Sequence, residues 1–339
     1  MAVKIGLVGR GFMGGMHLSA YAAIRGAQVV AVCDTDKNKL KPDVAMAGNI
    51  EASGAGMDLS HVRWTTRLDD LLNDPDIDLV DITLPTYLHA DAAVKAFAAG
   101  KHVISEKPMA LCTADARRMA TAAKKARKRL FVGHCIRYWP AYAKAREIVQ
   151  SRKYGKVISA RFVRLSLTPT WSWKNWLLDA SKSGGAALDL HIHDSDFILY
   201  TFGAPKAVVS HGAGLKKGRI DHIVTAYEYG DGKLVTAEGA WLYSEGFGFQ
   251  MQFAIAMEKA TLLCAPDLKL MVHPVKGKST TVRLSKHDGY ALELRDFIRC
   301  AGKDTASDVV PPQSAVESVQ LLEAEMKSVA TGKRVAMKC

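Results

Sequence analysis

A pattern of three glycines near the start restricts the possible folds of this chain more than any other segment. Residues 3–8 are mostly apolar and strand-like, the glycines follow at once as Gly-x-Gly-x-x-Gly, and a helix-like stretch continues to residue 25. In such a unit, Gly9 allows a tight turn, Gly11 lets a phosphate approach the backbone, and Gly14 lets the helix pack close to the strand. The pattern therefore predicts a phosphate-binding turn, with a plain glycine turn of an α/β protein as the alternative.

Asp34 makes the expected ligand more specific. It ends a second apolar run, residues 28–33, and lies twenty residues after Gly14. At that position a carboxylate accepts hydrogen bonds from an adenosine ribose, while free amides at the helix start face the pyrophosphate. We expect NAD, with NADP less favoured because Asp34 would repel a 2′-phosphate, although Arg10, Lys37 and Lys39 lie close enough in sequence to soften that preference. The expected contacts come from Gly9, Gly11, Phe12, Met13, Gly14 and Asp34.

The pattern of apolar runs changes near residue 133. Before it, strands and helices alternate, which is typical of a parallel doubly wound sheet, and about six strands make a complete Rossmann unit. After it, a helix near residues 185–202 is followed by mostly strands joined by turns, which indicates a large, open, mostly antiparallel sheet. We expect an NAD-binding α/β domain over residues 1–133 and an α+β domain for substrate binding and oligomerisation over residues 134–339. Residues 39–60 predict a short helix and a surface loop.

Composition and charge argue against several classes of protein. The net charge is +12, but the one dense basic cluster, residues 124–129, closes a helix and has no interleaved aromatics, so nucleic acid binding is not expected. The apolar runs are shorter than the ~20 residues of a membrane span, and the chain enters its first strand without a leader pattern, so no membrane is expected. The six cysteines lack metal-binding spacing. We expect no metal, and the cytoplasm as the location.

Lys107 is the first candidate for chemistry. It lies in Ser105-Glu106-Lys107-Pro108, directly after the fifth expected strand. Because the carboxyl ends of parallel strands face the ligand crevice, Lys107 is expected to meet a substrate beside the nicotinamide. The proline that follows restricts its backbone to extended conformations. A solvated loop lysine is the alternative.

A second candidate group follows a Ser-Gly-Gly turn. Asp189 and His193 are four residues apart and Asp196 is three further, so a helix places all three on one face, with His191 nearly opposite. An imidazole oriented by a carboxylate one turn away is a good general base near neutral pH, which predicts His193 as the base and Asp189 as its partner. A structural histidine is one alternative. Zinc binding by both histidines and an aspartate is another, although a helix separates the histidines.

Three of the six tryptophans, Trp171, Trp173 and Trp176, lie within six residues just before this helix. Indole faces stack on the C–H faces of sugars, and indole N–H groups donate to hydroxyls. We expect Trp173 to contact a hydroxyl-rich ring. Trp171 and Trp176 can more easily serve packing in the core, and a core role for at least one of the three is the alternative.

Together these motifs resemble the glucose-fructose oxidoreductase and inositol dehydrogenase family, often written Gfo/Idh/MocA, over essentially the whole chain. The resemblance rests on the glycine pattern, on segments 83–89, 106–108, 132–140, 183–185 and 290–297, and on Asp189-x-x-x-His193-x-x-Asp196. It implies catalytic roles for Lys107, Asp189 and His193. Substrate contacts are expected from these three residues together with Arg137 and Trp173. Cofactor contacts are expected from Thr83, Leu84, Pro85, His89, Glu106 and Lys107.

The resemblance also implies a homodimer or homotetramer formed through the C-terminal sheet. Two positions depart from the family pattern, because His191 replaces a usually small residue and Cys135 stands where asparagine is common. The activity class therefore transfers better than the substrate. We expect hydride transfer between NAD and a secondary alcohol of a sugar, inositol or related polyol. A non-catalytic dinucleotide-binding regulatory protein and a metal-dependent hydrolase are the alternatives.

Overall fold

The computed structural model describes residues 2–41, 59–216 and 218–337, so most of the helix and loop expected over residues 39–60 lies outside the described residues. The chain forms two compact units. The first comprises Met1–Cys135, Trp171–Trp176 and Gly289–Glu317, and the second comprises Ile136–Thr170, Leu177–Asp288 and Ser318–Cys339. The expected single boundary after residue 133 is therefore too simple, because two later segments join the first unit.

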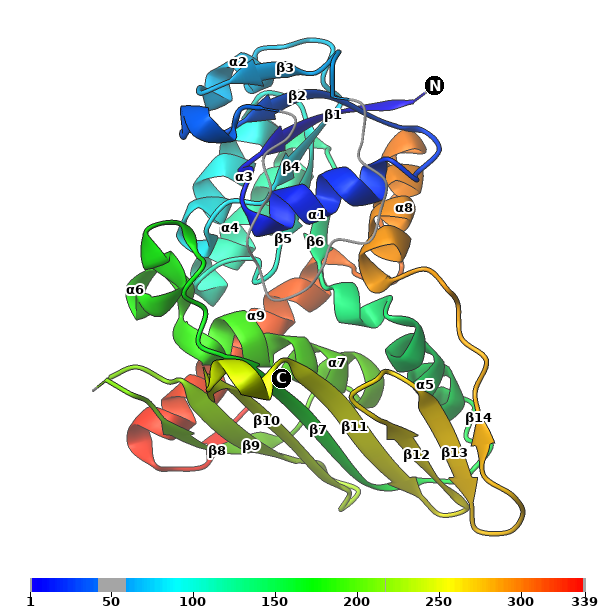
Figure 1. Ribbon diagram of the computed structural model, residues 1–339. Helices are drawn as coiled ribbons and strands as arrows, with labels where there is room; N and C mark the ends of the chain where they lie inside the picture. The colour runs from blue at the N-terminus through cyan, green and yellow to red at the C-terminus, as the bar shows by residue number, and fades with distance from the viewer. Residues whose placement is uncertain (1, 42–58, 217, 338–339) are drawn as a thin grey trace. The chain divides into compact units, whose positions relative to one another are not determined.

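The first unit contains a six-stranded parallel sheet with the strand order β3-β2-β1-β4-β5-β6 (Figure 1). Its strands are β1 (Val3–Val8), β2 (Ala27–Cys33), β3 (Arg63–Thr65), β4 (Leu79–Ile82), β5 (His102–Glu106) and β6 (Leu130–Gly133). Nearly every side chain of β1 and β4 is buried, as in sheets covered on both faces. The order reverses between β1 and β4, which confirms the expected doubly wound sheet and marks where such sheets bind ligands.

Among the described residues, five helices and several short helical turns complete this unit. They are α1 (Phe12–Tyr21), η1 (Lys37–Lys39), α2 (Leu68–Leu72), η2 (Thr86–Leu88), α3 (His89–Ala98), α4 (Thr113–Ala126) and α8 (Gly289–Gly302), with η3 (Cys135–Arg137) and η4 (Trp173–Leu178) at its borders. The helix after the glycines ends at Tyr21, earlier than expected. Helix α8 packs against α1, and its Phe297 stacks on Phe131 of β6 with ring centroids 5.1 Å apart. This contact explains why α8 belongs to the first unit.

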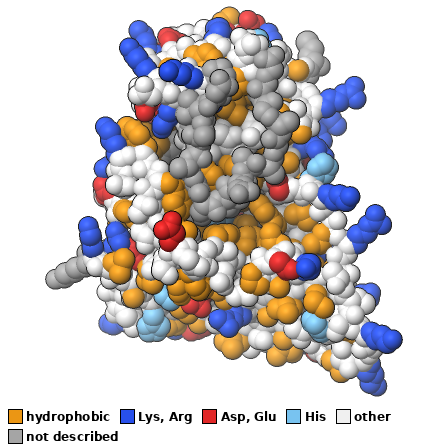
Figure 2. Space-filling model, viewed as in Figure 1, with side chains coloured by type: hydrophobic (Ala, Val, Ile, Leu, Met, Phe, Trp, Pro, Cys, Tyr) orange, Lys and Arg blue, Asp and Glu red, His pale blue; other side chains and the backbone are white. Residues whose placement is uncertain are grey.

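The dense basic cluster lies where α4 ends. Lys124 and Lys125 occupy the last turn, where cations complement the helix dipole, and Arg127 follows with a left-handed φ of 53°. Lys and Arg side chains are scattered over the visible face of the molecule and do not gather into one patch there (Figure 2). Among the described residues, no helix combines the length and hydropathy needed to cross a membrane.

The second unit is built on a nine-stranded sheet with the order β14-β13-β12-β11-β7-β10-β9-β8-β15. Its strands are β7 (Val157–Leu167), β8 (Ala207–Ala213), β9 (His222–Glu228), β10 (Leu234–Tyr243), β11 (Gln250–Met257), β12 (Ala260–Cys264), β13 (Leu270–Pro274), β14 (Thr280–Thr281) and β15 (Val335–Ala336). The pairings are antiparallel except that of β7 with β10. That pair is parallel because a helical crossover separates β7 from the hairpins β8-β9-β10.

The helices of this unit lie along one face of the sheet (Figure 1). They are α5 (Pro140–Gln150), α6 (Ala180–Ser183), the π-helical turn η5 (Ala187–His191), α7 (Ile192–Phe202) and α9 (Pro312–Thr331), with η6 (Glu245–Phe247) after β10. Aromatic side chains join the layers, since Phe162 packs on Phe197 and Tyr142 on Phe253, with ring centroids 5.8 and 4.8 Å apart. The expected helix near residues 185–202 is thus a π-helical turn continued by an α-helix.

Candidate active site and cofactor-binding residues

Each of the three positions in the first loop is glycine for a different structural reason. Gly9 has a φ of +95°, and a Cβ there would lie 2.8 Å from the carbonyl oxygen of Thr83. A Cβ on Gly14 would lie 2.2 Å from the carbonyl oxygen of Gly9, so this glycine lets α1 pack against the turn. A Cβ on Gly11 would meet no atom of the described residues within 4 Å. Packing among the described residues therefore does not require a glycine there, and an open backbone at the start of α1 is what the approach of a pyrophosphate would need.

Asp34 is held in place at the end of β2. Its Oδ2 accepts a hydrogen bond from the Arg10 amide at 2.8 Å, and its Oδ1 accepts one from the Asp36 amide at 2.9 Å. Each carboxylate oxygen has a second lone pair, so both can still accept from ribose hydroxyls. Lys39 Nζ lies 3.8 Å from Oδ2, and the Arg10 guanidinium donates to the Lys39 and Lys41 carbonyls and lies over the Trp64 ring. The Lys39 ammonium therefore lies close to the carboxylate, whereas Arg10 contacts it through its main-chain amide.

The turn after β4 is tied to the glycine loop and to the lysine segment. Thr83 Oγ1 donates to the carbonyl of Gly9 at 2.6 Å, which joins β4 to the loop. The fully buried His89 has Nδ1 2.9 Å from the Pro108 carbonyl and Nε2 2.8 Å from the Leu84 carbonyl. Burial lowers its pKa. His89 thus holds the backbone of this turn in place through its two carbonyl contacts. Leu84 and Pro85, in contrast, are partly exposed.

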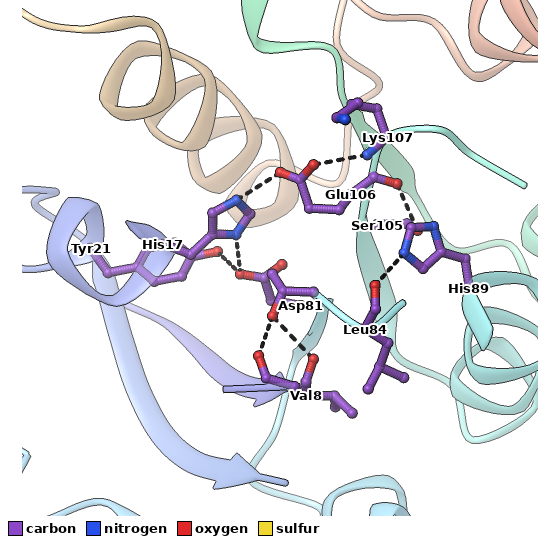
Figure 3. A network of polar contacts seen from close by, with 11 residues as sticks. Val8, His17, Tyr21, Asp81, Leu84, His89, Ser105, Glu106 and Lys107 are labelled. Atoms are coloured by element: carbon purple, nitrogen blue, oxygen red, sulfur yellow. Dashed lines mark hydrogen bonds and ion pairs between the residues drawn. The ribbon is translucent and has the colours of Figure 1, made fainter. Parts of the chain in front are cut away.

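A buried ionic network lies beneath Lys107 (Figure 3). The imidazole of His17, on α1, has Nδ1 2.8 Å from Asp81 Oδ2 and Nε2 3.1 Å from Glu106 Oε1. Tyr21 donates its hydroxyl to the same Asp81 oxygen at 2.8 Å. The other Glu106 oxygen accepts a hydrogen bond from the Lys107 amide at 3.0 Å. Through Glu106, α1 therefore restrains the main chain of Lys107.

The network is charged. Burial acts to lower the pKa of His17, but the charge and hydrogen bonds of Asp81 and Glu106 outweigh it and raise the pKa well above its usual value. Burial acts to raise the pKa of Glu106, but the hydrogen bond and charge of His17 leave it below its usual value. Both ring nitrogens of His17 face carboxylates, which fits an imidazolium that donates twice.

Sequence reasoning missed His17 and Asp81. His17 follows Gly14 by three residues, and Asp81 interrupts an otherwise apolar strand. An acid inside a buried strand requires a partner, and that was the available signal. The sequence alone could not predict that α1 contacts the strands β4 and β5.

Asp189 and His193 stand out in the second unit. From Gly185 to Ile198 every residue is buried except these two. Asp189 belongs to the π-helical turn and His193 to the first turn of α7. A mostly buried segment therefore presents one carboxylate and one imidazole, the pair expected from the sequence.

Asp196 does not share their partly exposed face. It is fully buried, and its oxygens accept hydrogen bonds from two nitrogens of Arg137, at 2.6 and 2.9 Å, and from the Ser318 hydroxyl at 2.6 Å. The π-helical turn ends before α7 and changes only the register of Asp189 relative to that helix. Asp196 lies within α7, and its bonds to Arg137 and Ser318 hold this carboxylate in the core. His191 does point elsewhere, as expected, with Nε2 3.0 Å from Glu325 Oε2.

Arg137 is only 2% exposed and forms the two bonds to Asp196 described above. Its guanidinium also lies over the Tyr200 ring, 4.5 Å from the centroid. Burial acts to lower its pKa, but the charge of Asp196 outweighs that effect and raises it. Arg137 thus holds α7 in place within the second unit through Asp196. This buried placement gives Arg137 a structural role that differs from the substrate contact expected from the sequence.

The tryptophan loop has an unusual backbone. Lys174 and Asn175 have left-handed φ values of 49° and 52°. Trp173 is 39% exposed, with Lys174 Nζ over its ring at 4.6 Å, whereas Trp171 and Trp176 are half-buried. The residue expected to stack on a sugar is therefore the most exposed of the three. Within the described ranges, no group of three or more His, Cys, Asp and Glu side chains is arranged to hold a metal ion.

Comparison with known proteins agrees with this reading. Residues 3–134 match the model of an oxidoreductase family with an NAD-binding Rossmann fold, and residues 142–263 match the Gfo/Idh/MocA C-terminal domain. The chain is 26% identical over 313 residues to scyllo-inositol 2-dehydrogenase (NAD(+)) of Bacillus subtilis, covering 88% of this chain and 86% of that protein. It is 32% identical over 181 residues to 1,5-anhydro-D-fructose reductase of Ensifer adhaerens, covering 52% of this chain and 54% of that one.

The fold of levoglucosan dehydrogenase, solved in complex with NADH and levoglucosan, matches with a TM-score of 0.84 at 22% identity over the whole of both chains. The two family matches span the parallel sheet and most of the nine-stranded sheet. The chain therefore belongs to the Gfo/Idh/MocA family of oxidoreductases, and its first unit is an NAD-binding Rossmann domain.

Proposed function

We propose that this protein is a dehydrogenase that transfers a hydride between NAD and a secondary alcohol of a sugar, inositol or related polyol. The observation that carries the proposal is the selective exposure of Asp189 and His193 in an otherwise buried segment. A carboxylate and an imidazole kept accessible in this way suit proton transfer to and from a substrate hydroxyl. A relative named scyllo-inositol 2-dehydrogenase, which matches over most of its length, supports the polyol class.

In the proposed reaction His193 removes the proton of the substrate hydroxyl. Asp189 orients the imidazole. The ammonium of Lys107 stabilises the negative charge that develops on the substrate oxygen. The nicotinamide ring supplies the hydride acceptor when NAD is bound. The buried Glu106 carboxylate supports this role of Lys107, because it holds the lysine main chain at the end of β5.

The cofactor contacts proposed for this chain follow the glycine loop, the start of α1 and the turn after β4. Gly11, with no packing reason for a glycine, supports the approach of the pyrophosphate. Asp34 supports a preference for NAD over NADP, since its carboxylate would meet a 2′-phosphate. Trp173 is the proposed platform for the substrate ring.

A non-catalytic dinucleotide-binding protein is the second candidate. It would need the glycine loop and Asp34 but would have no use for Lys107 or for the accessible pair Asp189 and His193. The presence of all three favours the enzyme.

The proposal is tested by incubating the purified protein with NAD or NADP and a panel of cyclic polyols, sugars, anhydrosugars and linear hydroxy acids, following the absorbance of the reduced nicotinamide. Reduction of NAD with at least one cyclic polyol or sugar is expected. Tight NAD binding without reduction by any member of the panel would favour the regulatory alternative.

We further propose a homodimer or homotetramer that forms through the nine-stranded sheet. Helices cover one face of this sheet, while Val224 of β9 and Leu263 of β12 are 41% and 36% exposed. Light scattering of the purified protein tests this, and a monomer would contradict it. None of the five described cysteines forms a disulfide, which supports the cytoplasm as the proposed location.

A further inference from the structure

We propose that His191 and Glu325 form a buried positioning pair that sets the orientation of Asp189 and His193. The inference rests on the proposed function, because it concerns the residues assigned to proton transfer. His191 lies between those two positions, and its role is not explained by the chemistry proposed above.

His191 is the last residue of the π-helical turn, two residues from Asp189 and two from His193. A π-helical turn closes its hydrogen bonds from residue i to i+5 and is found mostly as a single turn, often at functional sites. Such a turn is less favourable than a continuous α-helix and persists where the surroundings hold it. The side chain of His191 is fully buried on the side away from the two partly exposed residues.

The imidazole is connected to the last helix of the chain. Nε2 of His191 lies 3.0 Å from Oε2 of Glu325 on α9, and both side chains are fully buried. Within the described part of the chain, Nδ1 of His191 has no hydrogen-bond partner. The proton of a neutral imidazole therefore resides on Nε2 and is donated to the carboxylate. This bond is the polar attachment of the turn to α9.

Neighbouring hydroxyl groups extend the attachment into the sheet. Tyr227 of β9 has its oxygen 3.4 Å from the same His191 nitrogen and 2.8 Å from Ser195 Oγ on α7. Thr225, also on β9, donates to Glu325 Oε2 at 3.1 Å. The pair is thus part of a buried network that includes the turn, α7, β9 and α9. Glu325 Oε1, like His191 Nδ1, has no hydrogen-bond partner among the described residues. The contacts that are made join four elements and so favour one arrangement of the backbone.

The sheet is shaped to receive the imidazole. Gly239 of β10 is buried beneath His191, and a Cβ there would lie 2.8 Å from both the Cβ and the Nδ1 of the histidine. The φ of Gly239 is not in the left-handed region, so conformational freedom does not explain the glycine. The space that His191 needs explains it. A small residue in the strand and a large one in the turn therefore fit each other.

The pair acts on the site through the backbone. If His191 shifts, the peptide units that carry Asp189 and His193 shift with it, and small displacements of catalytic groups lower turnover strongly. The prediction is a loss in kcat, with the NAD affinity of the first unit unchanged. A role limited to global stability would lower the amount of folded protein and leave kcat of the folded fraction intact.

The test compares His191→Ala, Glu325→Ala, the double variant and the conservative His191→Gln. Gln150→Ala is the matched control, since it removes a hydrogen bond to the Thr201 carbonyl at the far end of α7. We expect kcat to fall by up to about 10²-fold in His191→Ala and Glu325→Ala. The double variant should be no worse than either single one, and His191→Gln, which can still donate to Glu325, should recover much of the loss. Gln150→Ala should keep wild-type kcat.

A second measurement does not depend on turnover. In His191→Ala the NMR titration of the His193 imidazole should shift from that of the wild type, while in Gln150→Ala it should not. Gly239→Ala should lower the melting temperature, and adding His191→Ala should restore part of it by removing the clash.

Two results would overturn the proposal. One is wild-type kcat in His191→Ala with additive effects of the two single substitutions, and the other is an unchanged His193 titration. If no substrate of the panel supports NAD reduction by the wild type, the proposed function fails. The NMR titration of His193 and the melting temperatures of Gly239→Ala with and without His191→Ala then still decide the positioning role.

Discussion

The imidazole of His17 holds the Glu106 carboxylate from one side, with Nε2 3.1 Å from Oε1. The other oxygen of that carboxylate bonds to the amide of Lys107 at 3.0 Å. Gly133 leaves room for the carboxylate, since a Cβ there would lie 3.0 Å from Oε1. A histidine of the first helix thus restrains the segment that carries the proposed catalytic lysine.

Replacing His17 by glutamine should destabilise the first unit. Asp81 and Glu106 would both lose a buried cationic partner, and removing one partner of a buried ion pair costs about 3–5 kcal/mol. Urea unfolding followed by intrinsic fluorescence measures the change. Arg334→Ala, which removes an exposed ion pair with Glu228, is the comparison. A loss of unfolding free energy in His17→Gln no larger than in Arg334→Ala would show that the network contributes little to stability.

The stability difference between wild type and His17→Gln should depend on pH. The pKa of folded His17 is raised above its usual 6.5, so its contribution is complete below 6.5 and is lost as pH rises through the raised pKa. The pKa of folded Glu106 is lowered below its usual 4.5, so its contribution is complete above 4.5 and is lost as pH falls through the lowered pKa. The difference should therefore be largest between pH 4.5 and 6.5 and should decrease as pH rises above 6.5. Tyr21→Phe, which leaves both ion pairs intact, is the control, and an equal pH dependence there would refute the assignment.

The glycines of the loop should separate folding from cofactor binding. Gly14→Ala places a Cβ 2.2 Å from the Gly9 carbonyl oxygen and should lower the melting temperature. The Cβ of Gly11→Ala meets no atom of the described residues within 4 Å, so this variant should fold normally and bind NAD more weakly. Thermal unfolding and titration with NADH, followed by its fluorescence, measure the two properties. Wild-type affinity in folded Gly11→Ala would place the pyrophosphate elsewhere.

Asp34→Ala should narrow the preference for NAD over NADP. The substitution removes the carboxylate that would repel a 2′-phosphate and leaves Lys39 and Arg10 nearby. The ratio of kcat/KM values for the two cofactors measures the effect, and Lys39→Ala should change that ratio in the opposite direction. Comparable efficiency of the wild type with both cofactors would contradict the preference.

Trp173→Ala should raise KM for a cyclic polyol or sugar several-fold with a smaller change in kcat. An exposed indole supplies contact area to the ring and takes no part in hydride transfer. Trp176→Ala, in the same loop, is the comparison, and its main effect should be on stability. An unchanged KM, or a linear hydroxy acid as the best substrate, would assign Trp173 to packing.

Local patterns predicted the parts of the fold that depend on neighbouring residues. The glycine loop, the alternating strands and Asp34 together specified the parallel sheet, because each strand–helix unit is read within about 30 residues. The hairpins β8-β9-β10 were likewise visible in their turns. The parallel pairing of β7 with β10 was not, since it joins strands separated by a helical crossover.

Contacts between distant segments account for what the sequence did not predict. Phe297 of α8 stacks on Phe131, and nothing near residue 297 indicates this partner. Asp196 was expected beside His193, but its partner Arg137, which precedes it by 59 residues, holds it in the core. The role of His17 depends on its contacts with Asp81 and Glu106, which belong to two other elements.

The most direct test of the account is the turnover of Lys107→Met and His193→Asn on the best substrate of the panel. Each should lower kcat by about 10² or more, as expected when an electrostatic or an acid–base contribution is lost. NADH titration should show unchanged cofactor binding in both variants, and chelators should leave the wild-type rate unaltered. Full activity in either variant, or zinc retained in stoichiometric amount and required for turnover, would contradict the assignment of Lys107 and His193 to hydride transfer chemistry.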